Sequence, residues 1–445
     1  MHASLPTLRT RCASLAWLLA LLVGCSTPPA SPPAAPSAAP SAASSATSSG
    51  SSPGSPSPSA AASDAGVASA DPDKNFARWL AAFSASARDA GISDATLHLA
   101  FDDAHLLPQV VDQDREQPEF ARALWDYLDR AVSAQRVATG QQRLQQCRAE
   151  ADAASARYGV PPAVIVAIWG IESNYGSNYG DVPTIDALAT LGFDGRREAW
   201  ARGQLLAALK ILQSGDITRT QMIGSWAGAM GQTQFLPTTF LSYAVDGDAD
   251  GRRDIWASMA DVMASTANFL ARSGWQPGQP WGVEVRLPED FNLARADETL
   301  REPSARWAAD GVMTMNGAPL PEFNDGAILL PAGARGPAFL VGPNYRAVLR
   351  YNNATSYALA VGLLAQRLEG GPGVIAAWPR DLQPLTRSQV TALQTALNAQ
   401  GFDSGAPDGL MGPATRAAVR RFQLSVNLAP DGFATTELLQ RLQAP

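Results

Sequence analysis

Residues 164–180 read VIVAIWGIESNYGSNYG, a run of apolar and small residues that delivers one carboxylate, Glu172, before polar and glycine residues break the pattern. A Pro-Pro pair just before the run favours a helix start. At helical spacing Ile165 and Ile168 lie on the same side as Glu172, so the acid projects from an apolar face near the helix end. Apolar surroundings disfavour the charged form of the acid and suit a general acid. The alternative is a helix-terminal glutamate that faces solvent.

The composition bounds the function classes. The chain has 445 residues, 46% of them hydrophobic, which is enough for two or three domains with packed cores. A formal net charge of -7 argues against a nucleic-acid partner. Histidine occurs only at His2, His98 and His105, which are too few to favour a histidine-based zinc site or a Ser-His-Asp triad.

The N-terminus predicts export. Residues 1–24 carry two arginines and then an apolar run that is too short to span a bilayer, which is typical of an export signal. The run ends in Leu22-Val23-Gly24-Cys25, which resembles the lipobox of bacterial lipoproteins. The resemblance implies that Cys25 becomes a lipidated N-terminus, and Ser26 fits outer-membrane sorting. The alternative is a plain secretory signal with a chance cysteine.

Residues 25–73 are rich in Ala, Ser and Pro and have no apolar periodicity, so they are predicted to form a disordered tether. A tether indicates a target at some distance from the membrane. Cys12 leaves with the signal and Cys25 carries lipid, so Cys147 is the one thiol left, which excludes an intramolecular disulfide. Its helical surroundings favour a packed free thiol over a reactive one.

Residues 74–370 are predicted to form a mainly helical first folded unit. Within it, residues 112–118 are polar and are interpreted first as a charged connecting loop and second as a substrate-facing strand or loop. The periodicity then shifts toward two, which predicts a small β-rich insertion. Its expected strands are residues 282–287, 327–330, 338–341 and 347–351.

Two polar or small-residue stretches follow the Glu172 segment. Arg196 and Arg197 come after a glycine-bounded turn and are either solvated charges or forks for acidic groups of a ligand. Residues 224–237 are dense in Gly, Ala and Ser, with Trp226 and Phe235 as faces on which sugar rings could stack. Tight helix packing is the alternative reason for the small residues, and the stretch alone favours it.

An aspartate-rich loop begins at Asp246. Asp246, Asp248 and Asp250 occupy positions 1, 3 and 5 of an EF-hand-like pattern, with glycine at position 6. Position 12 is Ala257 rather than a bidentate glutamate, and Asp261 is the nearest downstream acid. The pattern favours a structural calcium ion of modest affinity over a metal-free Asp/Gly-rich turn.

Residues 380–445 are predicted to form a separate three-helix module. Pro413 is placed to open the second helix, and a Pro-Asp-Gly turn occurs twice, at residues 407–409 and 430–432. The module holds no obvious catalytic cluster, so binding is its expected role.

Several motifs together resemble the lytic murein transglycosylase B family. They are IESNYG at 171–176, DALATL at 186–191, GSWAGAMGQTQFLP at 224–237, the Asp246 loop and RYN at 350–352, in the family's order over residues 74–369. The tail is similar to a small peptidoglycan-binding domain with the pattern DGxxGPxT, here at 408–415. Several motifs in one order are more specific than any one of them.

The resemblance implies a lysozyme-like helical fold and an enzyme that cleaves the β-1,4 bond between N-acetylmuramic acid (MurNAc) and N-acetylglucosamine (GlcNAc) in peptidoglycan. In this family the muramyl C6 hydroxyl attacks C1 and leaves a 1,6-anhydro end without consuming water. One carboxyl group suffices, as acid and then as base, whereas an ordinary glycosidase uses two. The resemblance implies no required cofactor; the calcium ion of the aspartate loop is a candidate structural ion.

Carried over residue by residue, the resemblance makes Glu172 the acid/base and implies a calcium site at Asp246, Asp248, Asp250 and Asp261. The implied substrate-binding residues are Ser225, Gln234, Tyr351, Asn352, Arg196 and Arg197. Two departures from the family pattern are Ala257 in the loop and Trp200, which stands at an aromatic position where tyrosine is familiar.

We therefore expect a monomeric outer-membrane lipoprotein of the periplasm that acts on peptidoglycan glycan strands. One alternative is a hydrolytic muramidase of the same fold, which would need a second carboxylate to activate water. The other is a non-catalytic peptidoglycan-binding lipoprotein.

Overall fold

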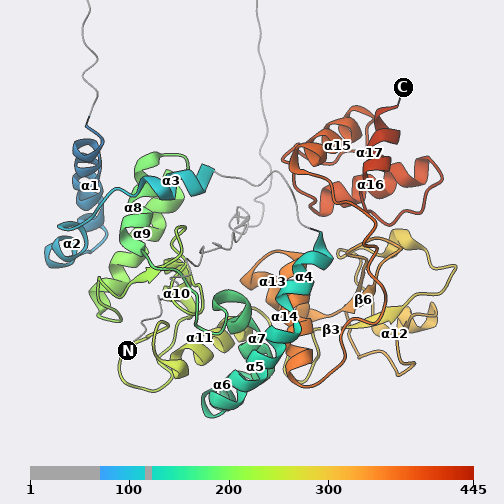
Figure 1. The fold of residues 1–445 in the computed structure, drawn as a ribbon, viewed down its shortest axis with the longest axis horizontal. Helices are drawn as coiled ribbons and strands as arrows, with labels where there is room; N and C mark the ends of the chain where they lie inside the picture. Colours follow the sequence, from blue (N-terminus) through green and yellow to red (C-terminus); the bar gives the residue numbers. More distant parts are fainter. Residues whose placement is uncertain (1–70, 116–122, 445) are drawn as a thin grey trace, which may run out of the picture. The chain divides into compact units, whose positions relative to one another are not determined.

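The structure, a computed structural model, describes residues 71–115 and 123–444 and is mostly helical, as the sequence predicts (Figure 1). The predicted signal segment, Cys25 and the tether up to residue 70 lie outside the described residues. The helices that precede the C-terminal module are α1 (Pro72–Asp89), α2 (Asp94–Phe101), α3 (Pro108–Arg115), α4 (Leu124–Ala131), α5 (Ala134–Gln146), α6 (Arg148–Tyr158), α7 (Pro162–Ser173), α8 (Thr184–Asp194), α9 (Glu198–Ser214), α10 (Pro237–Tyr243), α11 (Met259–Arg272), α12 (Ser304–Ala309), α13 (Pro343–Tyr351) and α14 (Thr355–Leu368).

The Glu172 segment forms α7, the central helix of the largest core. Ten of its twelve residues are buried, and it packs against α5, α6, α11 and α14. Because α7 is apolar on all sides, only a surrounding shell of helices can keep it from water. Across the part of the chain that the structure describes, no single helix is long and apolar enough for a membrane span; α6 and α7 meet the criterion only as a pair bent by 115°.

The chain reverses at the end of α7. Asn174 and Tyr175 both adopt positive φ, 50° and 59°, which folds the Tyr175 ring back over Gly170. A Cβ on Gly170 would lie 2.5 Å from that ring, so a side chain does not fit there. Trp169 contacts the same ring edge-on and donates to Gln232 Oε1 at 2.8 Å. The reversal therefore ties the helix end to the glycine-rich segment around residue 232.

Two small antiparallel sheets accompany the helices. One pairs β1 (Val182–Pro183) with β2 (Ile223–Gly224). The other has the order β4-β3-β6-β5 and forms the predicted β-rich insertion, which also contains a short 3-10 helix, η1 (Leu293–Arg295). Its strands are β3 (Gly282–Arg286), β4 (Met313–Thr314), β5 (Ala327–Leu329) and β6 (Ala338–Val341). Three of the four expected strands are confirmed.

Two local predictions are wrong. Residues 347–351 are the last turns of α13, not a strand, because Pro343 opens a helix whose buried residues Tyr345 and Val348 are three apart. The polar segment that starts at residue 112 is not a loop up to residue 115, because it belongs to α3. Only Val110 and Asp114 of α3 are buried, four residues apart, so its apolar pattern is too sparse to read.

The C-terminal module consists of α15 (Arg387–Ala399), α16 (Pro413–Ser425) and α17 (Thr436–Gln443), which enclose their own core. As predicted, Pro413 opens α16. Each Pro-Asp-Gly turn is held by a glutamine from the preceding helix, Gln394 for Gly409 and Gln423 for Gly432, with N–H to Oε1 distances of 2.9 Å in both. The sequence echo is therefore a structural repeat.

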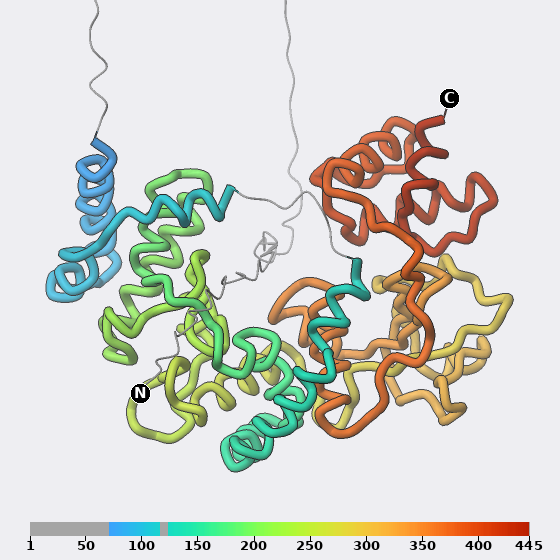
Figure 2. The backbone as a smooth tube through the Cα atoms, in the orientation of Figure 1, coloured from blue at the N-terminus to red at the C-terminus, as the bar shows by residue number. Residues whose placement is uncertain are grey.

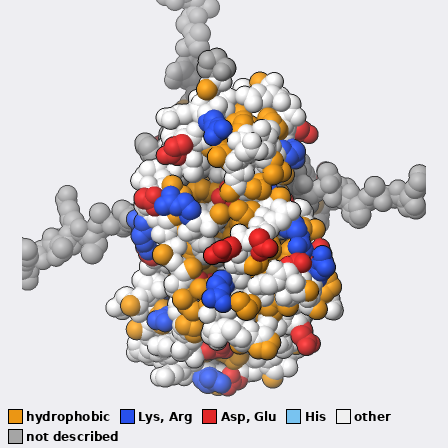
Figure 3. Space-filling view, turned by 90° about the vertical axis from the view of Figure 1, so that its right-hand side faces the viewer, with side chains coloured by type: hydrophobic (Ala, Val, Ile, Leu, Met, Phe, Trp, Pro, Cys, Tyr) orange, Lys and Arg blue, Asp and Glu red, His pale blue; other side chains and the backbone are white. Residues whose placement is uncertain are grey.

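The path of the chain can be followed in Figure 2, where the segment after α14 continues into the module. Figure 3 shows one face of the molecule, on which acidic and basic side chains are interspersed with apolar ones. Neither sign of charge dominates that face, in keeping with the small net charge of -7.

Candidate active site

Glu172 lies in the last turn of α7 and is only 8% exposed, so the alternative of a solvent-facing glutamate is wrong. Its Oε1 accepts a hydrogen bond from the Tyr357 hydroxyl at 2.6 Å, while Oε2 is buried without a hydrogen-bond partner among the described residues. Burial raises the pKa of the carboxyl from 4.5 to about 7, and the Tyr357 hydrogen bond opposes part of that rise. The group can therefore both give and take a proton near neutral pH.

Three tyrosines from different helices face Glu172. Tyr357 of α14 and Tyr351 of α13 have nearly parallel rings with centroids 6.3 Å apart, and Tyr127 comes from α4. Burial and the Glu172 charge raise the pKa of Tyr127 to about 12 and hold the pKa values of the other two well above 10. All three therefore stay neutral, and Tyr357 acts as a hydrogen-bond donor to the acid.

Sequence reasoning missed Tyr357 and Tyr127. Tyr357 lies five residues after the RYN motif, in a segment whose sequence pattern does not distinguish it from the apolar residues around it. A buried tyrosine hydroxyl needs a partner, and that requirement was the one signal available. The partner lies 185 residues away in the chain, so only the packing of α14 on α7 reveals it.

Ser225 and Gln234 lie in a tight loop that follows β2. The Ser225 Oγ accepts from the Ala229 N–H at 3.1 Å, and the Gln234 side chain donates to the carbonyls of Tyr179 and Gly231 at 3.0 and 2.9 Å. A Cβ on Gly224 would lie 2.0 Å from the Ala229 carbonyl. At Gly224 the small residue is therefore required by close packing within this loop, which is not helical.

Phe235 is buried between the rings of Phe269 and Tyr351, so it offers no face for a sugar. Trp226 is partly buried and packs in a small cluster with Trp200. Tyr351 donates to the Thr233 carbonyl at 2.7 Å and so joins the end of α13 to the Ser225–Gln234 loop. Asn352, the next residue, forms the C-cap of α13 and is half-buried.

Arg196 and Arg197 are not simply solvated, because both contact the buried carboxylate of Asp114 on α3. Arg196 Nε donates to Oδ2 at 2.6 Å, and an Arg197 Nη lies 3.0 Å from Oδ1 in an ion pair without hydrogen-bond geometry. The Arg197 guanidinium also stacks 4.4 Å from the centroid of the Trp200 ring. One carboxylate shared by two guanidinium groups leaves a net positive charge for an acidic ligand.

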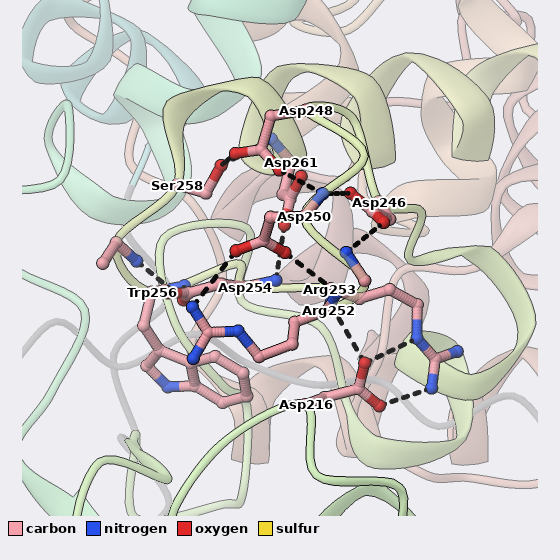
Figure 4. A network of polar contacts seen from close by, with 12 residues as sticks. Asp216, Asp246, Asp248, Asp250, Arg252, Arg253, Asp254, Trp256, Ser258 and Asp261 are labelled. Atoms are coloured by element: carbon pink, nitrogen blue, oxygen red, sulfur yellow. Dashed lines mark hydrogen bonds and ion pairs between the residues drawn. The ribbon is translucent and has the colours of Figure 1, made fainter.

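The aspartate loop brings three carboxylates together (Figure 4). Ligand oxygens of Asp246, Asp248 and Asp261 lie within 4.8 Å of one another. Asp261 is fully buried and accepts from two backbone N–H groups, and burial, together with the charges of Asp248 and Asp246, raises its pKa to about 6. A hard cation would relieve this repulsion, so the oxygen-only donor set fits calcium.

Asp250, which the pattern also assigns to the loop, is not in this group. Its carboxylate pairs with Arg252 at 3.1 Å and accepts from the Arg252 N–H, and Figure 4 shows the guanidinium reaching to it. Gly251, at position 6, has φ of 92°, as a sharp turn requires. Asp261 therefore belongs to the carboxylate group although it lies four residues beyond position 12 of the pattern, whereas Asp250, at position 5, does not.

The chain belongs to the family defined by the transglycosylase SLT domain, whose model matches residues 75–366. Residues 386–442 match a second family, described as a putative peptidoglycan-binding domain. These matches confirm the family, the fold class and the enzyme class of its members that the motifs predicted.

Solved structures of similar proteins are consistent with this family assignment. SltB3 from Pseudomonas aeruginosa, in complex with NAG-anhNAM-pentapeptide, is 51% identical with a TM-score of 0.81, over 83% of this chain and 99% of that one. The Escherichia coli lytic transglycosylase Slt35, in complex with calcium, is 29% identical with a TM-score of 0.55, over 67% of this chain and 93% of that one.

A curated relative, the membrane-bound lytic murein transglycosylase B of Escherichia coli K12, is 34% identical over 216 residues. The match covers 47% of this chain and 57% of that protein, so the chain spans little more than half the length of this relative.

Proposed function

We propose that the chain is a lytic transglycosylase that cleaves the β-1,4 bond between MurNAc and GlcNAc of peptidoglycan and leaves 1,6-anhydromuramyl ends. The observation that carries the proposal is the isolation of Glu172. It is a buried acid with a pKa of about 7 whose recorded partner is a neutral tyrosine, and no carboxylate of the described residues acts on that pKa. The family match and the anhydro sugar bound to SltB3 support the same reaction.

One carboxyl group then performs two proton transfers. Protonated Glu172 gives its proton to the glycosidic oxygen as the bond from that oxygen to the muramyl C1 breaks. The resulting carboxylate, held by the Tyr357 hydroxyl, takes the proton of the C6 hydroxyl as the C6 oxygen bonds to C1. The acid ends protonated as it began, and no water enters the products.

Asp186, one of the two aspartates that follow Glu172 most closely in the sequence, is engaged in other contacts. Asp186 is buried and accepts from Arg219 at 2.6 Å and from the His105 N–H at 2.7 Å. An acid whose two carboxylate oxygens are held by an arginine and a backbone N–H is committed to a structural ion pair and is not free to activate a water. This arrangement favours the transglycosylase over a hydrolase that needs a second catalytic carboxylate.

The polar residues around the site serve the substrate. Ser225, Gln234, Tyr351 and Asn352 orient the sugar or stabilise its developing charge. Arg196 and Arg197 bind acidic groups of the glycan or its stem peptide with the donors that Asp114 leaves. Asp246, Asp248 and Asp261 hold a structural calcium ion, while Asp250 supports the loop through Arg252.

Residues 1–24 direct export, Cys25 carries lipid at the outer membrane, and residues 25–73 let a monomeric catalytic unit of residues 74–370 reach the wall. Residues 380–445 then bind peptidoglycan. Replacement of Cys25 with serine tests the anchor, because the protein should move from the membrane fraction to the soluble periplasmic fraction. Retention of the Cys25→Ser protein in the membrane would contradict lipid anchoring.

Mass spectrometry of digested peptidoglycan tests the reaction. Wild-type protein should release anhydromuramyl products, and Glu172→Gln should release none while still binding sacculi. Reducing MurNAc ends in place of anhydro ends would establish the hydrolytic muramidase, and binding without cleavage by either protein would establish the non-catalytic lipoprotein.

A further inference from the structure

A buried glutamine, Gln232, lies in the middle of the glycine-rich loop. It is 8% exposed, and both ends of its side-chain amide are hydrogen-bonded. Its Oε1 accepts from the Trp169 indole N–H at 2.8 Å, and its Nε2 donates to the Trp256 carbonyl at 2.7 Å. The backbone N–H of Gln232 also donates to the Ile255 carbonyl at 2.9 Å. One residue therefore joins the catalytic helix α7 to the end of the aspartate loop, where Figure 4 shows Trp256.

Trp169 carries this restraint to the catalytic acid. It lies three residues before Glu172 in α7, so the two side chains leave neighbouring positions on one side of the helix. The turn that ends α7 closes over the amide, because a Cβ on Gly176 would lie 2.2 Å from Gln232 Oε1. A rotation of the last turn of α7 would therefore leave a buried indole N–H without its partner.

The residue after Gln232 holds the other side of the site. The Thr233 carbonyl accepts from the Tyr351 hydroxyl at 2.7 Å. The Tyr351 ring lies nearly parallel to that of Tyr357, the residue that donates to Glu172 at 2.6 Å. Two adjacent residues of one loop thus hold the helix of the acid and the tyrosine pair that faces the acid.

We propose that Gln232 is a positioning residue for glycan cleavage, which fixes the last turn of α7 through Trp169 and so places the Glu172 carboxyl for proton transfer. This inference rests on the proposed role of Glu172. Misplacement of a catalytic group by about 1 Å costs on the order of a hundredfold in rate, so loss of the Gln232 amide acts on kcat. The amide is buried and bonded within the protein at both ends, so it has no group left for a sugar and KM changes little.

Gln232→Met tests the proposal in the full chain, with a soluble muropeptide that carries stem peptides as the substrate. Methionine keeps the length of the side chain but removes the amide, so the Trp169 N–H and the Trp256 carbonyl lose their partner. We expect kcat to fall roughly tenfold and KM to change by less than about twofold. Trp169→Phe removes the same hydrogen bond from the other side, should lower kcat similarly, and carries the test if Gln232→Met does not fold.

The double variant shows whether the two residues act through one hydrogen bond. Because both changes delete the same contact, the double variant should lose about tenfold in kcat, as either single variant does, whereas independent effects would multiply to about a hundredfold.

Gln204→Met is the matched control. Gln204 of α9 is 7% exposed, and its amide bonds to Thr238 in the first turn of α10, at 3.0 and 3.1 Å, rather than to α7. The same substitution at this position should lower thermal stability, because it also strands buried polar groups, but it should leave kcat at the wild-type value.

The inference is overturned if Gln232→Met and Trp169→Phe keep a wild-type kcat while Glu172→Gln is inactive. It is equally overturned if the two losses multiply in the double variant, or if Gln204→Met loses as much kcat as Gln232→Met, since either pattern indicates general destabilisation alone. Cleavage by Glu172→Gln would instead contradict the proposed function.

Discussion

Replacement of Tyr357 with phenylalanine removes one oxygen atom from the site and leaves the ring. Among the residues that the structure describes, its hydroxyl is the one donor to Glu172, at 2.6 Å, and it opposes the rise of the acid's pKa that burial causes. A hydrogen bond to a charged group contributes about 1.5–3 kcal/mol, which corresponds to roughly one to two pKa units. The pKa of Glu172 in the variant should therefore rise from about 7 to 8 or above.

The sign of the kinetic effect follows from the order of the two proton transfers. A higher pKa keeps Glu172 protonated to higher pH, so the basic limb of kcat/KM should move upward by at least one unit. The carboxylate that forms during the reaction loses its donor, so kcat should fall roughly tenfold or more. The pH–rate profile on a soluble muropeptide measures both changes.

Tyr351→Phe provides the comparison, because the Tyr351 hydroxyl bonds to the Thr233 carbonyl and not to Glu172. That variant should have lower activity or stability than the wild type, but the basic limb of its kcat/KM pH profile should not move. A Tyr357→Phe protein whose limb coincides with that of the wild type would refute the assignment of the proton-transfer group or of its donor.

Three further predictions concern stability and calcium. The pKa of Glu172 in the folded protein lies above its ordinary value of 4.5, so the contribution of this residue to the free energy of unfolding is present at low pH and is lost as pH rises through about 7. At pH 9 the free energy of unfolding of Glu172→Gln, measured by chemical denaturation, should therefore be about 3 kcal/mol higher than that of the wild type. Calcium at a hundredfold excess over its Kd should raise the free energy of unfolding of the wild type by roughly 3 kcal/mol. Asp261→Asn should lose this stabilisation, and Asp250→Asn should keep most of it. Equal losses in both variants would contradict the three-carboxylate site. Asp114→Asn should destabilise the fold by about 2–3 kcal/mol because it strands two arginines, whereas Asp152→Asn, which loses an exposed pair with Arg148, should cost under about 1 kcal/mol.

The central helix and its acid could be predicted because their signal is local. Residues 164–171 are almost continuously apolar, so any folded arrangement must bury them, and Glu172 is carried inward with them. The same reasoning found the three longest strands of the insertion. It failed at residues 347–351, which read AVLRY, since so short a segment fits a strand or a helix equally well and only Pro343, four residues earlier, decides.

The rest of the site depends on contacts between distant residues. Helix α3 is held by Asp114 and its arginine partners 82 and 83 residues away, and a polar sequence gives no sign of this. Tyr357 reaches Glu172 because α14 packs on α7. In the aspartate loop the sequence made both Asp250 and Asp261 candidate calcium ligands. Only the fold shows that Asp250 pairs with Arg252, whereas Asp261 lies with Asp246 and Asp248.

The most direct test of the central claim is the product spectrum of purified sacculi after digestion by wild-type protein and by Glu172→Gln at neutral pH. We expect 1,6-anhydromuramyl fragments from the wild type and none from the variant, with equal binding of both proteins to sacculi. Products that end in reducing MurNAc, or anhydro products that persist in Glu172→Gln, would contradict a single-glutamate transglycosylase.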